Sequence, residues 1–397
     1  MSNLRYPFRK SWRWFLIDAL DRVLDVVSIP KRQPFVPDAV RNILVIRLDH
    51  IGDVVCSLPV FPILKRRFPN ARISVLVSQE GEALLAHHPY VDHVIVFRSN
   101  WFARTSRLDL GEMFRVLSEL RNSKFDIGFD LRGDIRNIGL MVLARIGYRV
   151  GYGIGGGKSL LAESPPYDTK LHQVELARNL VTSEPISRNE LKPEIYLTLE
   201  EKKSAWDLLA SWGVSRQDYV IGLHPEAGYP SKEWGTDRYR DLVGKLIQKP
   251  ETKVLVFGLD RAETVKKHYA SSKQVVSCVG NLSLREAIAT LHCCHVFIGN
   301  DSGLSHIAHA LRIPTVVIAS GTNEYEKWGV WLKPSMAVKH EVSCSPCHLE
   351  QCPIPGHPCL SDITVEQVAE AIRSVQTLDP TSRLVDNDSQ TGVFRLT

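Results

Sequence analysis

The sequence predicts an α/β protein built from two doubly wound domains in tandem. From residue 42 onward, short apolar segments with the pattern of strands alternate with segments that have the pattern of helices. Such βαβ alternation favours a parallel sheet with helices on both faces. The alternation stops at residues 153–195 and then restarts, and the length of 397 residues suits two domains.

The first series begins with a strand at residues 43–48, an apolar run that only Arg47 interrupts and that is typical of a strand buried on both faces. It continues with a helix at 52–68, strands at 73–77 and 93–97, a helix at 110–121, a strand at 126–131 and a helix at 135–146. Glycines at 153 and 155–157 then predict a flexible loop, and Pro185 and Pro193 lie in a polar stretch. We therefore place the first domain at residues 41–190.

The second series has the same alternation and predicts a domain at residues 191–376. Its expected helices lie at 199–212, 237–247, 261–270, 284–292, 303–311 and 363–376. Its expected strands lie at 219–223, 254–257, 275–279, 296–299 and 315–319. The last residues, 377–397, are polar and predict a disordered tail.

Residues 1–40 predict an amphipathic, basic extension. On a helix, Trp12, Phe15, Leu16 and Leu20 share one face, and arginines and lysines lie near it. This pattern suits the surface of an anionic bilayer, and it equally suits a helix packed on the protein itself. Both interpretations stay open.

The composition excludes several classes of protein. Lys and Arg number 49 and Asp and Glu 44, and the resulting charge of +5 is far from that of a dedicated nucleic-acid binder. No apolar run reaches the roughly 18 residues that span a bilayer, and the start of the chain has no signal-peptide pattern. We therefore expect a cytoplasmic protein with reduced cysteines, peripheral on the inner face of the cell membrane if residues 1–40 bind lipid.

Candidate site residues of the first domain follow its strands, because ligands of open α/β sheets bind beyond the carboxyl ends of the strands. Gly52 allows a close approach to the backbone, and Asp53 is either a general base or a helix N-cap. Arg132, Asp134 and Arg136 follow a later strand. They form either a site for an anionic, hydroxyl-rich ligand or a structural cluster of ion pairs.

Three segments of the second domain suit a nucleotide. Small residues at the start of a helix, with a histidine one turn later, suit a phosphate: Asn300, Asp301, Ser302, Gly303 and His306. Capping by Asn300 or Asp301 is the alternative. Lys232, in the loop 224–234, would neutralise a leaving phosphate or else belongs to a solvated loop. Asp260 is either a ribose ligand or an N-cap.

Four cysteines lie close together near the end of the second domain: Cys344, Cys347, Cys352 and Cys359. In a reducing compartment this spacing predicts a structural zinc site, whose four protein ligands would leave no open position for catalysis. Free thiols that pack a loop are the alternative.

The order of these motifs resembles glycosyltransferase family 9, the heptosyltransferases of lipopolysaccharide core assembly. The matching segments are Ile43–Arg47 with Gly52-Asp53 and Leu58-Pro59, His224-Pro225 with Lys232 and Trp234, residues 300–306, and Pro346-Cys347. The resemblance covers residues 42–375. The sequence departs from the family pattern at Ala227 and Gly228, where many members carry Ser or Thr, and in the extension 1–40.

The resemblance implies a GT-B fold, with two Rossmann-like domains that face a cleft, the acceptor on the first and the donor on the second. It implies an inverting transfer, without metal or other catalytic cofactor, from a nucleotide sugar to a glycolipid or oligosaccharide acceptor. In the best-known members the donor is ADP-heptose and the acceptor is the lipopolysaccharide core.

By the same match, Asp53 would be the general base and Lys232 would stabilise the departing diphosphate. Four residues would hold the phosphates: Asp301, Ser302, Gly303 and His306. Asp260 falls near a ribose-binding carboxylate of the family. The alternatives are a nucleotide-sugar epimerase or hydrolase of the same fold, and a nucleotide-sugar-binding protein without catalysis, which would need no base.

Overall fold

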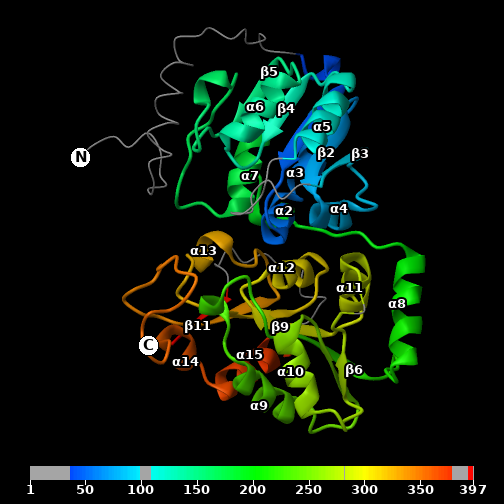
Figure 1. Ribbon diagram of the computed structural model, residues 1–397, viewed down its shortest axis with the longest axis vertical. Coiled ribbons are helices and arrows are strands. Elements are labelled where there is room, and N and C mark those ends of the chain that lie inside the picture. Colours follow the sequence, from blue (N-terminus) through cyan, green and yellow to red (C-terminus); the bar gives the residue numbers. More distant parts are fainter. Residues whose placement is uncertain (1–35, 99–108, 281, 378–391, 397) are drawn as a thin grey trace. The chain divides into compact units, whose positions relative to one another are not determined.

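The computed structural model describes residues 36–98, 109–280, 282–377 and 392–396. The chain divides into two compact units, with the boundary between Leu191 and Lys192 (Figure 1). The predicted amphipathic segment, apart from its last residues 36–40, lies outside the described residues. Within the described ranges, no helix is long and apolar enough to cross a membrane.

The first unit contains a five-stranded parallel sheet in the order β3-β2-β1-β4-β5. The strands are β1 (Asn42–Arg47), β2 (Arg72–Ser78), β3 (His93–Phe97), β4 (Ile127–Asp130) and β5 (Tyr148–Gly151). The chain moves outward from β1 to β3 and then returns to the other side of β1 to form β4. The loops after β1 and β4 therefore flank the point where the strand order reverses, which is where open α/β sheets bind ligands.

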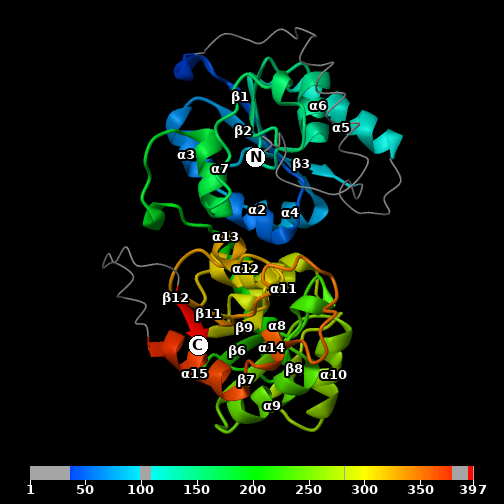
Figure 2. The same ribbon diagram turned by 90° about the vertical axis from the view of Figure 1, so that its left-hand side faces the viewer.

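Helices cover both faces of this sheet. They are α2 (Ile51–Ser57), α3 (Val60–Arg67), α4 (Gln79–Leu85), α5 (Leu110–Asn122), α6 (Ile135–Leu143) and α7 (Gln173–Val181). Side chains of α5 and α6 share a buried cluster with Leu44 and Ile46 of β1. Figure 2 shows α3 and α7 on the opposite side of β1 and β2.

The second unit contains a seven-stranded parallel sheet in the order β12-β11-β10-β9-β6-β7-β8. The strands are β6 (Tyr219–His224), β7 (Thr252–Val256), β8 (Val275–Ser277), β9 (Val296–Asn300), β10 (Thr315–Ala319), β11 (Ser335–His340) and β12 (Gly392–Leu396). Here the strand order reverses between β6 and β9, so the loops after these two strands occupy the corresponding position.

Two layers of helices pack on this second sheet. The helices are α8 (Leu199–Ser211), α9 (Thr236–Leu246), α10 (Asp260–His268), α11 (Leu284–Leu291), α12 (Gly303–Ala310), α13 (Tyr325–Trp328), α14 (Pro358–Ser361) and α15 (Val365–Thr377). Residues of α9, α10 and α15 share one buried cluster with β6, β7 and β9. On the other face, Leu291 of α11 lies against Gly222 of β6.

Several expected elements differ from the structure. The single helix expected at 52–68 is two helices, α2 and α3, because Pro59 has no N–H to continue the first and instead caps the second. The stretch at 153–195, expected to be irregular, contains α7, which begins at a capping box formed by His172 and Glu175. The strands β5 and β11 and the helix α4 were also not expected.

Residues 392–396, near the end of the segment predicted to be a disordered tail, are a strand in the structure. This segment forms β12 and extends the sheet in parallel beside β11. Val393, Phe394 and Leu396 are residue types that favour strands, and an unpaired edge of β11 offers them backbone partners.

Candidate functional site

The structure brings Asp53 close to a buried arginine at the end of β1. Asp53 lies in the first turn of α2, and its Oδ1 accepts a hydrogen bond from Nη2 of Arg47 at 3.1 Å. Arg47 is only 5% exposed. Its Nε lies 3.1 Å from Oδ2 of Asp49, and its Nη1 donates to the carbonyl of Leu131 in the loop after β4. The Asp53 carboxylate is thus held on one side by a fixed cation.

The loop after β4 brings the predicted Arg132, Asp134 and Arg136 to this same place. Arg132 forms an ion pair with Asp49, and its Nε lies 3.6 Å from Asp134. Asp134 caps α6 and accepts hydrogen bonds from the backbone and the guanidinium of Arg136. All three predicted residues and Asp53 therefore belong to one network of charges that spans β1 and β4.

The ionisation of this network is set by burial and by its partners. Burial lowers the pKa of Arg132 to about 10, which leaves it charged at neutral pH. Burial by itself would raise the pKa of Asp134, but the hydrogen bonds and charge of Arg136 lower it. Arg132 and Asp134 are therefore both ionised at neutral pH.

Asp130, at the end of β4, fixes the loop that carries these residues. Its side chain is fully buried and accepts hydrogen bonds from the backbone N–H groups of Arg132 and Asp134 and from the side chain of Asn137. Burial raises the pKa of Asp130 to about 6. Asp130 itself has no exposed surface, so it acts on the site through the loop.

The glycine-rich segment predicted to be flexible makes a specific contact with this loop. The N–H of Gly155 donates to the carbonyl of Gly133 at 2.7 Å. A Cβ at position 155 would lie 2.8 Å from that carbonyl oxygen, so only glycine allows the approach. Gly133 has φ +82°, in the left-handed region. The glycines thus support the loop that carries the arginines.

In the second unit, the loops after β6 and β9 join Lys232 to Asp301. Nζ of Lys232 lies 2.7 Å from Oδ2 of Asp301, and both side chains are little exposed, at 13% and 11%. Asn323, after β10, also donates to Oδ2 of Asp301, at 3.4 Å. The structure therefore places the predicted leaving-group lysine beside the predicted phosphate-binding segment.

Asn300, which the sequence predicted to bind the nucleotide, has its side chain inside the protein. It is fully buried, and its Oδ1 accepts hydrogen bonds from the backbone N–H of Trp234 and the hydroxyl of Tyr239. Its Nδ2 donates to the carbonyl of Pro225. Both ends of its amide hold the Lys232 loop against β9, so this residue positions the loop and is not available to a ligand.

Ser302, Gly303 and His306 form the start of α12. Ser302 is the N-cap residue, and its hydroxyl lies 3.2 Å from Nδ1 of His224 at the end of β6. Burial lowers the pKa of His224 to about 4, so the ring is neutral at neutral pH. Gly303 begins the helix, and His306 is buried one turn later. The first turn of α12 thus presents backbone N–H groups at the end of β9.

Asp260 begins α10 after β7, and its side chain lies outside the described part of the structure. The neighbouring carboxylate of Glu226 accepts hydrogen bonds from the backbone N–H groups of Leu259 and Ala262. Glu226 therefore performs the capping that the sequence assigned to Asp260 as an alternative. Gly258 has φ +133°, and a Cβ there would meet the Glu226 carboxylate at 3.0 Å.

The zinc site proposed at the four cysteines stays a prediction. Within the described ranges, no group of three or more His, Cys, Asp or Glu residues is arranged to hold a metal ion. All four thiols are free: Cys344 is exposed, Cys347 and Cys352 are partly exposed, and Cys359 is buried at α14. Burial raises the pKa of the Cys359 thiol, and the nearby thiols of Cys352, Cys344 and Cys347 raise it further, so the four thiols lie in one neighbourhood.

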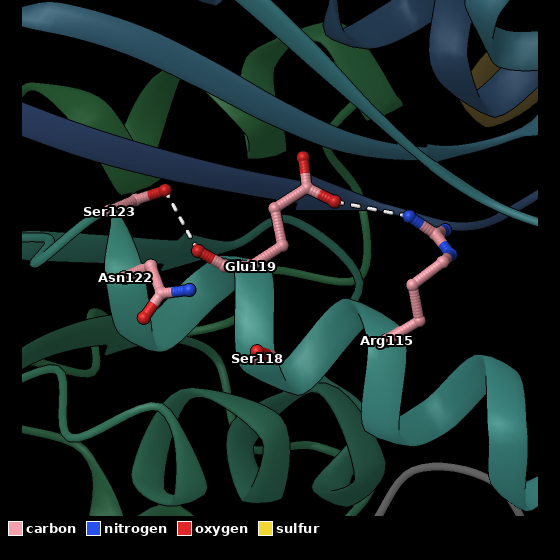
Figure 3. Close-up of a pocket in the computed structure, with 5 residues that line it drawn as sticks. All are labelled: Arg115, Ser118, Glu119, Asn122 and Ser123. Atoms are coloured by element: carbon pink, nitrogen blue, oxygen red, sulfur yellow. Dashed lines mark hydrogen bonds and ion pairs between the residues drawn. The ribbon is translucent and has the colours of Figure 1, made fainter.

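A separate hollow of about 480 Å³ lies along α5 (Figure 3). It is lined by Arg115, Ser118, Glu119, Asn122 and Ser123. Arg115 and Glu119 form an ion pair across one turn, and the Ser123 hydroxyl donates to the Glu119 carbonyl. None of the predicted site residues lines this hollow, and one helix supplies nearly all of it, so it is not part of the candidate site.

Comparisons with known proteins found a matching family model and similar proteins. A family model described as glycosyltransferase family 9 (heptosyltransferase) matches residues 113–357, which is more than half of the chain. The match includes the loops that carry Arg132, Lys232 and Asp301 and begins after Asp53.

Two curated relatives and one solved structure are similar. Lipooligosaccharide heptosyltransferase 2 of Campylobacter jejuni is 31% identical over 167 residues, which span 40% of this chain and 52% of the relative. Lipopolysaccharide heptosyltransferase 2 of Salmonella typhimurium is 26% identical over 295 residues, 70% of this chain and 82% of the relative. The structure of Escherichia coli ADP-heptose LPS heptosyltransferase II has a TM-score of 0.67 and 23% identity, and covers 84% of this chain and 98% of its own. The predicted fold class, GT-B with two Rossmann-like units, is confirmed.

Sequence reasoning gave no role to two residues of the first site, Arg47 and Asp49. A charged residue within an otherwise apolar strand needs a buried partner, so Arg47 did carry a signal. In the second unit it missed Asn323 and the capping role of Glu226. Neither has a distinctive sequence pattern, because both contacts depend on how separate loops meet at the edge of the sheet.

Proposed function

This chain belongs to glycosyltransferase family 9, and we propose that it transfers heptose from ADP-heptose to a lipopolysaccharide core or a related cell-surface glycan. The names of the relatives support this donor and acceptor. The observation that carries the proposal is the pairing of Lys232 with Asp301 at the position where the strand order reverses. A cation there is suited to the diphosphate of a nucleotide sugar.

In the proposed reaction an acceptor hydroxyl attacks the anomeric carbon of the donor with inversion. The new bond joins the acceptor oxygen to that carbon, and the bond from the carbon to the phosphate oxygen breaks, its electron pair leaving with ADP. Asp53 takes the hydroxyl proton. One of its carboxylate oxygens is engaged by Arg47, and the other is the one that would accept the proton.

Lys232 would neutralise the charge that develops on the departing diphosphate, together with the N–H groups at the start of α12. This compensation lets the reaction proceed without a metal in our proposal. Asp301 would hold the Lys232 ammonium in place instead of meeting the phosphates itself, because a carboxylate repels them. Ser302, Gly303 and His306 would line the phosphate site, and Asp260 would bind the ribose.

Arg132, Asp134 and Arg136 would bind the acceptor, whose anionic and hydroxyl groups suit paired arginines and a carboxylate. We further propose that residues 1–40 hold the enzyme at the inner face of the cell membrane, where a glycolipid acceptor lies. Flotation of the chain with anionic liposomes, with and without residues 1–40, tests this second step. Equal flotation of both forms would refute it.

The transfer itself is tested with ADP-heptose and a heptose-free lipopolysaccharide core. We expect one ADP released for each heptose gained by the acceptor, measured by mass spectrometry, and activity that persists in EDTA. NMR of the product should give an anomeric configuration opposite to that of the donor. Release of ADP without a gain in acceptor mass would instead identify a hydrolase, and no reaction with ADP-heptose would refute the proposed donor.

A further inference from the structure

The cysteine-rich segment contacts the loop that carries Lys232, although it holds no metal group in the described structure. Lys232 ends a short 3-10 turn, Pro230–Lys232, between β6 and α9. The preceding Ser231 is 1% exposed. Its N–H donates to the carbonyl of Glu350 at 3.1 Å, and its hydroxyl donates to the carbonyl of Leu349 at 2.5 Å.

A second segment, after β10, holds the other side of Ser231. The hydroxyl of Thr322 donates to the carbonyl of Ser231 at 3.1 Å and accepts from the hydroxyl of Ser320 at 2.9 Å. Thr322 is 3% exposed. All three polar groups of Ser231, its N–H, its carbonyl and its hydroxyl, are therefore occupied by residues outside its own loop.

The two segments are also joined to each other. The N–H groups of Cys347 and His348 donate to the carbonyls of Gly321 and Thr322, at 3.1 and 3.0 Å. Asn323, the next residue of the same segment, donates to Asp301, the partner of Lys232. We call residues 320–323 and 347–350 the brace, since they contact Asp301, the partner of Lys232, and Ser231, the residue before Lys232.

We propose that Ser231 and Thr322 are positioning residues for Lys232, through which the brace fixes its ammonium group for the donor diphosphate. This inference rests on the proposed function, in which Lys232 meets that diphosphate. A flexible lysine side chain at the end of a loop loses much conformational freedom when it binds an anion. A loop held at every polar group of Ser231 has already lost part of that freedom before the donor binds.

The test measures the Kd of ADP for the full chain by calorimetry. Thr322→Val keeps the shape but removes the Thr322 hydroxyl that donates to the Ser231 carbonyl, and we expect ADP to bind about tenfold more weakly. Thr322→Ser keeps the hydroxyl and should bind ADP within about twofold of the wild type. Ser231→Ala removes the hydrogen bond to the Leu349 carbonyl and should raise the Kd of ADP about threefold. Its matched control, Ser211→Ala, loses the same kind of hydroxyl-to-carbonyl bond on exposed α8 and should have no effect.

The Lys232→Ala background separates positioning from a general loss of structure. If the brace acts through Lys232, Thr322→Val should cost less than twofold in ADP affinity once Lys232 is absent. An equal loss in both backgrounds would overturn the inference, and so would wild-type affinity in both Thr322→Val and Ser231→Ala. Ser231→Ala serves as the decisive variant should Thr322→Val fail to fold, as judged by thermal unfolding.

The outcomes also separate this inference from the proposed function. If ADP binds and Lys232→Ala weakens it while the brace variants do not, the inference alone fails. If Lys232→Ala binds ADP as tightly as the wild type, the proposed role of Lys232 and the inference both fail. If none of ADP, GDP, UDP and CDP binds the wild type, the nucleotide-sugar function fails and the inference with it.

Discussion

Replacement of Arg47 by methionine should destabilise the first unit strongly. The Arg47 side chain is 6% exposed, and its two carboxylate partners, Asp49 and Asp53, are 2% and 14% exposed. Removing one partner of a buried ion pair costs roughly 3–5 kcal/mol, because the other charge is left uncompensated. Arg132 still contacts Asp49 after the change, so we expect the lower end of this range, about 3 kcal/mol.

The assay is urea unfolding of the full chain at pH 7, with the hydrogen exchange of peptides from residues 36–191 as the readout. This readout reports the first unit separately from the second. With a slope of roughly 2 kcal/mol per molar urea, a loss of about 3 kcal/mol moves the midpoint by about 1.5 M. Arg47→Lys keeps the charge without the planar pair of donors and should lie between Arg47→Met and the wild type.

The double variant Arg47→Met/Asp49→Asn tests the physical reason. If an uncompensated carboxylate causes the loss, neutralising Asp49 should recover about 1–2 kcal/mol relative to the sum of the single changes. A loss below about 1 kcal/mol for Arg47→Met would mean that the pair contributes no more than an exposed one. Additivity of the two changes would equally refute the reasoning.

Four further predictions concern the sites. Lys232→Ala should lower kcat by about 10²–10³-fold, measured as ADP release, while Lys253→Ala, whose ammonium donates to the Lys273 carbonyl beside β7, should not. Asp53→Asn should lower kcat by about 10²–10⁴-fold without changing the Kd of ADP, and a matching loss in ADP affinity would contradict its role as base. The pKa of His224 falls from 6.5 to about 4 on folding, so the unfolded chain takes up the proton at a higher pH than the folded chain. The free energy of unfolding of the second unit should therefore fall by about 3 kcal/mol as the pH falls from 6.5 to 4. His224→Gln should remove this dependence in urea titrations. The pKa of Asp130 rises from 3.8 to about 6 on folding, so the free energy of unfolding of the first unit should fall by about 3 kcal/mol as the pH rises through that interval. Asp130→Asn should remove this dependence of stability on pH.

The strand-and-helix alternation predicted the fold well because each buried strand carries its own apolar run. The four-residue β5 and the strand β11, which includes Lys339, lack such a run, so pattern alone could not find them. Helix α7 is similarly hidden in a stretch that glycines and prolines mark as irregular. What identifies it is the capping box of His172 and Glu175, a local signal that is visible in the sequence.

The meeting of Lys232 with Asp301 could be predicted in outline from the sequence. Each follows a strand, and the carboxyl ends of parallel strands share one edge of the sheet. The role of Asn300 could not be predicted, because an asparagine with a buried amide and one whose amide binds phosphate look the same in a sequence. Only the positions of Trp234 and Tyr239 decide between them. The zinc site at the four cysteines stays a prediction, since spacing along the chain does not by itself fix the distances between the thiols.

The two units place a related pair of charges at the same topological position, with the roles exchanged. In the first, the reactive group of the proposed mechanism is the carboxylate of Asp53, and Arg47 holds it. In the second, the reactive group is the ammonium of Lys232, and Asp301 holds it. Each partner comes from the sheet edge and is little exposed, so each reactive group is held in one direction before a substrate arrives. A base and a leaving-group cation that are already oriented need little reorganisation when the transition state forms. Fixed charges accelerate a displacement for this reason.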